Sequence, residues 1–208
     1  MIRNILWKVD GVLFDTYPAI TYAISKSLNE MGESLALNVI DKLVRESIDL
    51  CLDTLSLRFK LDPKLLRDKF TDAYREIDPV NQPPFPYVRE LCERIHARGG
   101  INIAIANQNL SAAQILLEEH ALAPYFTDTV SMKESPPHKS NAKILFSLQE
   151  KYQLNAVQTA LITNNESDMR AGQDVGLRVC LYRNADTHLQ ADVHISEYSQ
   201  LLEKISGH

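Results

Sequence analysis

Short apolar runs alternate with amphipathic stretches along most of this chain. The runs have the length and composition of buried strands, and the stretches between them have apolar residues at helical spacing. We predict strands at residues 5–9, 101–106, 127–132, 159–163, 178–182 and 193–195. We predict helices at residues 87–98, 111–120, 141–152, 166–175 and 197–205. Because single helices separate the later strands, the pattern indicates an α/β fold with a doubly wound parallel sheet.

A long helical segment interrupts this alternation directly after the first strand. Residues 17–79 keep a helical pattern with breaks at Gly32 and at Asp62, where Asp62 can cap a helix that Pro63 begins. The proline-rich residues 81–86 cannot continue a helix. We therefore predict two domains, an α/β core at residues 1–15 and 82–208 and a small helical cap at residues 16–81.

Charge and apolar run length limit the classes of partner. The chain has 208 residues and a formal net charge of -5, and no basic block runs along it. Nucleic acid is therefore not an expected partner. The apolar runs are far shorter than the roughly 18 residues of a membrane-spanning helix. No signal-peptide core precedes Asp10, so we expect no membrane association and a cytoplasmic location.

The three cysteines do not form a recognisable site. Cys51, Cys92 and Cys180 are widely separated and lie in apolar stretches. Neither a disulfide framework nor a metal-binding CxxC pair is available. We expect buried structural thiols.

Ligands of doubly wound sheets bind at the carboxyl ends of the strands. In this chain those ends fall at residues 8–12, 106–108, 132–139 and 163–168. These four segments are where functional side chains are expected.

The first strand and its following turn carry a recognisable motif. Residues 5–16 read Ile-Leu-Trp-Lys-Val-Asp-Gly-Val-Leu-Phe-Asp-Thr, which resembles the opening motif of the haloacid dehalogenase (HAD) superfamily, Asp-x-Asp-Gly-Thr/Val-Leu. Residues 103–107 are similar to the family strand that ends in Thr/Ser-Asn, and residues 168–176 to its Asp-x-x-Ala-Gly-x-x-x-Gly. The resemblance implies a Rossmann-like HAD core, and the insertion point is similar to that of phosphatases and phosphoglucomutases with a helical cap.

The resemblance also implies a mechanism. In the family the first Asp attacks a phosphoryl group and the second Asp protonates the leaving group. A Thr or Ser of the second motif and a Lys of the third hold the transferring group, and a Gly-Asp pair helps to bind Mg²⁺. A carboxylate is a competent nucleophile, a strand places residues two apart on one face, and a divalent cation offsets the repulsion between the anions.

This sequence departs from the pattern at several of those positions. Lys8 stands at the nucleophile position, and Asp10 matches the acid/base position. Ala106 replaces the hydroxyl of the second motif and leaves Asn107 to face a ligand. A protonated lysine has no lone pair with which to attack, so the usual first step is not expected.

The later motifs depart as well. Ser135 aligns with the lysine of the third motif, and Lys139, four residues on, either reaches the site from a rearranged loop or lies in solvent. Asn164 replaces the aspartate of Gly-Asp, whereas Asp168 keeps the last acid. Mg²⁺ prefers carboxylate oxygens, so the Mg²⁺ that the resemblance implies is predicted to be lost. We expect the Lys8 ammonium to take its place beside Asp168 and Asp10, and we expect no cofactor.

Three functions remain open. The first is a pseudoenzyme that binds a small anionic metabolite, such as a phosphometabolite, or has a regulatory role, with Asn107, Ser135, Lys139 and Asn164 beside the Lys8–Asp168 pair as binding residues. The second is a phosphatase-like hydrolase with an altered mechanism, in which Asp10 or Asp168 acts as a general base. The third is a structural or interaction subunit that binds a protein partner.

Overall fold

The computed structural model describes residues 1–107, 110–132, 141–184 and 188–206 of the chain. It divides into two compact units, residues 1–14 with 84–208, and residues 15–83. The division falls after Phe14 and after Pro83. The backbone N–H of Asp15 donates to the carbonyl oxygen of Pro83 at 2.9 Å, which joins the two ends of the second unit.

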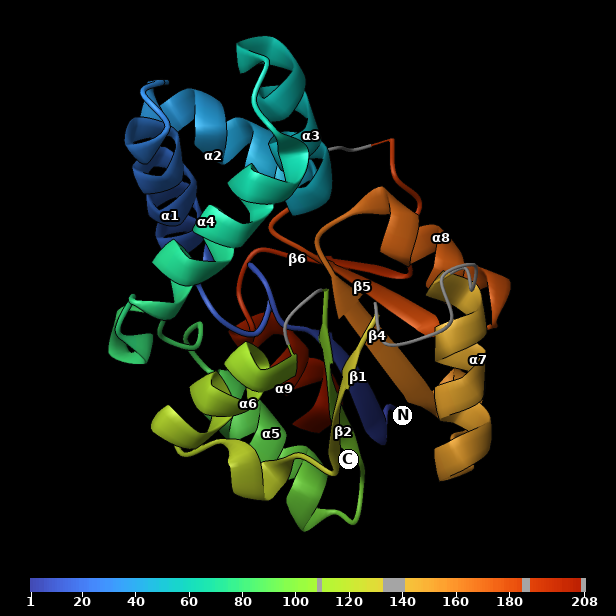
Figure 1. Cartoon of the computed structure of the whole chain (residues 1–208). Helices are drawn as coiled ribbons and strands as arrows, with labels where there is room; N and C mark the ends of the chain where they lie inside the picture. Colours follow the sequence, from blue (N-terminus) through green and yellow to red (C-terminus); the bar gives the residue numbers. More distant parts are fainter. Residues whose placement is uncertain (108–109, 133–140, 185–187, 207–208) are drawn as a thin grey trace. The chain divides into compact units, whose positions relative to one another are not determined.

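The first unit contains a six-stranded parallel sheet with the strand order β3-β2-β1-β4-β5-β6, which confirms the predicted fold class (Figure 1). The central strand β1 has all but its first residue buried, as expected for a strand covered on both faces. The strands are β1 (Asn4–Lys8), β2 (Asn102–Ala106), β3 (Asp128–Ser131), β4 (Thr159–Thr163), β5 (Arg178–Tyr182) and β6 (Val193–Ile195).

Helices cover both faces of the sheet. Helices α5, α6 and α9 pack on one face around Trp7, and helices α7 and α8 pack on the other around Leu6 and Leu161 (Figure 1). Their bounds are α5 (Val88–Ala97), α6 (Leu110–Glu119), α7 (Asn141–Tyr152), α8 (Glu166–Asp174) and α9 (Ser199–Ser206). Short 3₁₀ turns lie at Pro79–Asn81, Ala123–Tyr125 and Ala156–Gln158. The α/β unit therefore has three layers.

The second unit is helical throughout and has its own apolar core. Its helices are α1 (Tyr17–Glu30), α2 (Leu37–Glu46), α3 (Ile48–Phe59) and α4 (Pro63–Arg75). The Asp62 side chain caps α4 as predicted, accepting a hydrogen bond from the Leu65 N–H at 2.7 Å. A break at Ser47 was not predicted. Ser47 is extended and its side chain caps α3, so the α2–α3 segment is two helices rather than one.

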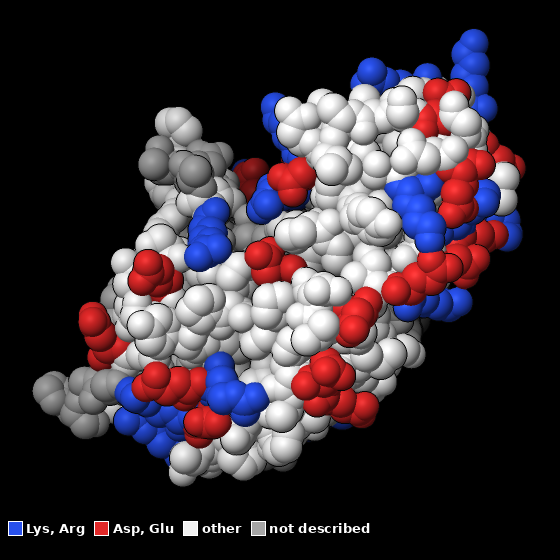
Figure 2. Space-filling model, turned by 90° about the vertical axis from the view of Figure 1, so that its left-hand side faces the viewer, with Lys and Arg blue, Asp and Glu red and all other residues white. Residues whose placement is uncertain are grey.

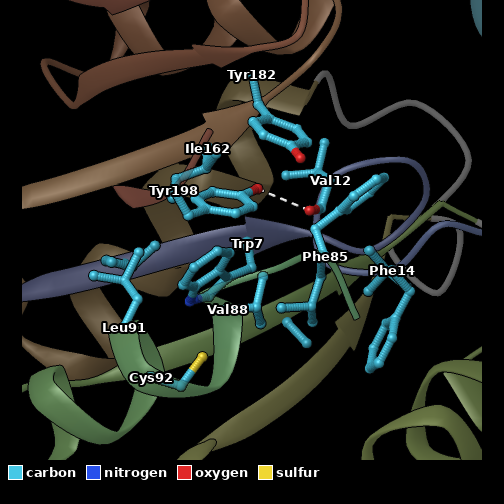
Figure 3. Packing of buried hydrophobic residues seen from close by; sticks show 14 of the residues in the cluster. Trp7, Val12, Phe14, Phe85, Val88, Leu91, Cys92, Ile162, Tyr182 and Tyr198 are labelled. Atoms are coloured by element: carbon cyan, nitrogen blue, oxygen red, sulfur yellow. Dashed lines mark hydrogen bonds between the residues drawn. The ribbon is translucent and has the colours of Figure 1, made fainter. Parts of the chain in front are cut away.

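A buried aromatic cluster supports the loop that follows β1 (Figure 3). The Tyr182 and Tyr198 rings stack with centroids 4.4 Å apart, and Trp7 packs against Tyr198. The Tyr198 hydroxyl donates to the carbonyl oxygen of Val12 at 2.7 Å. This bond ties the turn just before α9 to the turn that carries Asp10.

Surface charge and helix length are two further properties of the described parts of the chain. On the face shown in Figure 2, Lys and Arg side chains are interspersed with Asp and Glu. Among the residues described, no helix is both long and apolar enough to cross a bilayer.

Candidate functional site

Several of the predicted site residues lie at one edge of the sheet. Lys8 is the last residue of β1, Asn107 directly follows β2, and Asn164 directly follows β4. These three strands are parallel neighbours, so their carboxyl ends share an edge. Gly11 turns the chain after Asp10 with a φ of 67°, a conformation that glycine adopts without strain.

Lys8 lies buried in an ion pair. The residue is 3% exposed, and its Nζ lies 3.1 Å from Oδ2 of Asp168, also 3% exposed. The ammonium also donates to Oδ1 of Asn107. The ion pair expected between Lys8 and Asp168 is therefore present. Both charges are compensated, as burial requires.

Asp168 accepts hydrogen bonds from four side chains. Oδ1 accepts from Asn141 Nδ2 at 2.9 Å. Oδ2 accepts from Lys8 and Asn165 Nδ2 at 3.1 and 2.8 Å, and from the Thr163 hydroxyl at 3.4 Å. Each carboxylate oxygen has two lone pairs, so these donors fill the capacity of Oδ2 and leave one acceptor position on Oδ1.

Asp10 and Asn164 lie at the half-buried rim of this pair. Asn107 Nδ2 faces Oδ2 of Asp10 at 3.5 Å, so the Asn107 amide lies between Lys8 and Asp10. Asn164 Nδ2 faces the carbonyl oxygen of Gly11 at 3.5 Å. Asn184 Nδ2 donates to the backbone oxygen of Asn164 at 2.8 Å. The rim therefore combines one carboxylate with neutral amides.

Not every predicted residue is among those described. Ser135 and Lys139 fall within residues 133–140, outside the described residues. Ala106, at the end of β2, is 3% exposed, so a methyl group stands where the resemblance implies a hydroxyl.

Three partners of Asp168 were not predicted from the sequence: Asn141, Asn165 and Thr163. The sequence does contain a signal for Asn165, because an Asn directly before a predicted helix is a typical N-cap. In the structure its Oδ1 accepts a hydrogen bond from the Asp168 N–H at 2.9 Å, at the start of α8. Nothing in the local sequence indicates the contact of Asn141, which arises only when α7 packs beside α8.

The cysteines are buried free thiols, as expected. Burial raises the pKa of Cys51 to about 12 and also raises that of Cys92. Within the described ranges, no group of three His, Cys, Asp or Glu side chains could hold a metal ion.

The side chains at this edge of the sheet do not form a suitable ligand set for the Mg²⁺ that the resemblance implies. Mg²⁺ needs oxygen ligands in near-octahedral array. Oδ2 of Asp168 already accepts from three side chains, one of which is the Lys8 ammonium, and Oδ1 accepts from Asn141. A divalent ion about 4 Å from that ammonium would be repelled by about 8 kcal/mol at an effective dielectric constant of about 20.

Three features are typical of capped phosphatase-like folds. They are a parallel sheet in an α/β unit, a helical insertion after the first strand, and acidic and amide side chains at the strand ends. The profile of the haloacid dehalogenase-like hydrolase family matches residues 5–182. The chain therefore belongs to the haloacid dehalogenase-like hydrolase family.

The relatives are distant but extend over most of the chain. A phosphoglycolate phosphatase of Photobacterium profundum is 25% identical over 219 residues, covering 98% of this chain and 96% of that protein. One of Vibrio parahaemolyticus is 24% identical over 185 residues, covering 84% and 81%.

Solved structures share the fold. A protein described as a predicted phosphoglycolate phosphatase from Haemophilus somnus matches with a TM-score of 0.85 at 16% identity, covering 99% of this chain and 98% of that one. A predicted phosphatase from Clostridium acetobutylicum matches with a TM-score of 0.82 at 16% identity, covering 99% of both chains. At this identity the likeness shows the fold alone.

Proposed function

We propose that this chain is a haloacid dehalogenase-like protein that does not run the metal-dependent aspartyl-phosphate reaction and binds a small phosphorylated metabolite without turning it over. The observation that carries the proposal is the buried Lys8–Asp168 ion pair at the end of β1. An ion-paired ammonium has no lone pair available for attack on phosphorus. Loss of a nucleophile alone typically lowers turnover by about 10⁶-fold.

The ligand class rests on the relatives and on the charges. The relatives described above are phosphoglycolate phosphatases, whose substrate is a small phosphorylated metabolite. Two groups at the strand ends carry N–H donors of the kind that contact phosphoryl oxygens, the Lys8 ammonium and the Asn107 amide. This supports a retained binding function over a purely structural one.

A turnover assay tests the loss of catalysis. Wild-type protein with Mg²⁺ should release no phosphate above background from a generic phosphomonoester or from phosphoglycolate. Lys8→Asp alone should stay inactive, because Ala106 and Asn164 remain. The triple variant Lys8→Asp, Ala106→Thr, Asn164→Asp provides the matched comparison, and circular dichroism checks its fold.

Wild-type turnover that disappears in Asp10→Asn would contradict the proposal and favour a hydrolase with an altered mechanism. The ligand is tested separately, because a molecule that binds only the folded state raises the melting temperature. Phosphorylated metabolites should raise it without being consumed. A flat response to all of them, with a protein partner that co-purifies, would favour an interaction subunit instead.

A further inference from the structure

The Lys8 ammonium has more N–H donors than it has acceptors among the described residues. An ammonium has three N–H donors. Among the residues that the structure describes, Lys8 Nζ contacts two acceptors, Oδ1 of Asn107 and Oδ2 of Asp168. The side chain is buried, so the third donor is not free to rotate through bulk water.

Oδ2 of Asp168, in contrast, has no acceptor position left. Four side-chain donors surround the two carboxylate oxygens, and the backbone N–H of Asp168 is held by Asn165. A divalent cation could bind Oδ2 only by displacing Lys8, Asn165 or Thr163, and one bound to Oδ1 would be repelled by the ammonium beside Oδ2. Each displacement would leave a buried or half-buried polar group without its partner, which is costly.

We infer that Lys8 is the resident counter-ion of this site, that it excludes divalent cations from Asp168, and that its third N–H binds an oxyanion in the absence of any metal. The oxyanion half of the inference rests on the proposed function, whereas cation exclusion does not. The contacts explain why the site needs no added cation, since the positive charge is covalently attached and already paired.

Titration with Mn²⁺, followed by electron paramagnetic resonance, tests the exclusion of cations. The wild-type protein should leave Mn²⁺ free at this site. Lys8→Asp removes the ammonium and adds a carboxylate beside Asp10 and Asp168, so it should gain a Mn²⁺ site. Lys143→Asp on the exposed surface of α7 makes the same change in net charge and should gain none.

Two results would overturn the exclusion of cations. One is Mn²⁺ binding by the wild type that Asp168→Asn abolishes. The other is a folded Lys8→Asp protein whose Mn²⁺ affinity equals that of Lys143→Asp. Circular dichroism establishes folding. If Lys8→Asp does not fold, Lys8→Asn, which removes the charge without adding another, takes its place and should also bind Mn²⁺ more tightly than wild type.

Calorimetric titration with inorganic phosphate tests the third donor. Wild-type affinity should be the same with Mg²⁺ and with EDTA. It should fall about tenfold or more in Lys8→Met, the effect of losing a charge-assisted hydrogen bond. Lys143→Met should bind as wild type does.

Phosphate binding that needs Mg²⁺, or that survives in folded Lys8→Met, would overturn this half of the inference, and so would the absence of any phosphate binding. These outcomes are distinct from a failure of the proposed loss of catalysis, which only the turnover assay detects.

Discussion

The Lys8 side chain changes the charge at the carboxyl end of β1. An acid at this position would add negative charge beside Asp10 and Asp168, whereas the ammonium neutralises one of these two carboxylates. The Lys8–Asp168 pair itself is electrically neutral. Its stability therefore depends on both partners being present.

Replacing Lys8 with Met should lower the free energy of unfolding by about 3 kcal/mol, because the Asp168 carboxylate stays buried without its cation. Urea unfolding measures the loss. Lys143→Met, at an exposed position of α7, should change stability by less than about 0.5 kcal/mol. In the double variant with Asp168→Asn, part of the loss should be recovered. A loss equal to that of Lys143→Met would show that the ion pair contributes nothing.

Asp128 provides a pH-dependent contribution at the residue scale. Burial raises the pKa of Asp128, but hydrogen bonds from the Tyr152 hydroxyl and the Lys151 ammonium outweigh it, so the pKa lies below its usual value. A lowered folded pKa stabilises the protein above the unfolded pKa of about 4, and the contribution disappears as the pH falls through the folded value.

Asp128→Asn should therefore lose stability relative to wild type at pH 7 and converge with it at low pH. Urea midpoints measured at both pH values check this. A constant difference between the two proteins across the acid range would contradict it.

At the scale of elements, most of the fold could be predicted from the sequence. Helix α7 and strands β4, β5 and β6 have the predicted bounds, because apolar periodicity and glycine or polar flanks define them locally. The α2–α3 break could not be predicted. Ser47 lies in a continuous helical pattern, and the apolar core of the second unit determines how the two helices diverge there.

The turn between α5 and β2 allows a sharp test of packing. A Cβ on Gly100 would overlap the carbonyl oxygen of Arg3, a backbone atom that cannot rotate away. Gly100→Ala should therefore lower the free energy of unfolding by at least about 2 kcal/mol. Gly32→Ala is the comparison, because Gly32 has a φ of 82° with open space around it and should cost only about 1 kcal/mol. Equal losses in thermal unfolding would contradict the overlap.

At the scale of the whole molecule, the net charge limits the partners. From a formal charge of -5, and from Lys and Arg interspersed among acids on the face of Figure 2, we predict weak binding of polyanions. The protein should pass through a heparin column at low salt while a basic protein of similar size is retained. Retention that added salt abolishes would contradict the prediction.

The residues of the candidate site were only partly predictable. Strand-end positions and a family resemblance predicted five of the candidate residues: Lys8, Asp10, Asn107, Asn164 and Asp168. The contact of Asn141 with Asp168 became visible only in the structure, whereas Asn165 could have been found from its N-cap position before α8.

The sequence by itself determined the order and type of the elements, the class of the fold and the chemical identity of the residues at the strand ends. These properties follow from local periodicity and from the rule that parallel strands end at one edge. Only the tertiary structure decided which of the described groups compensate Asp168 and which of them the Lys8 ammonium contacts. Such partners come from segments far apart in the chain, and only packing of the helices on the sheet brings them within hydrogen-bonding distance.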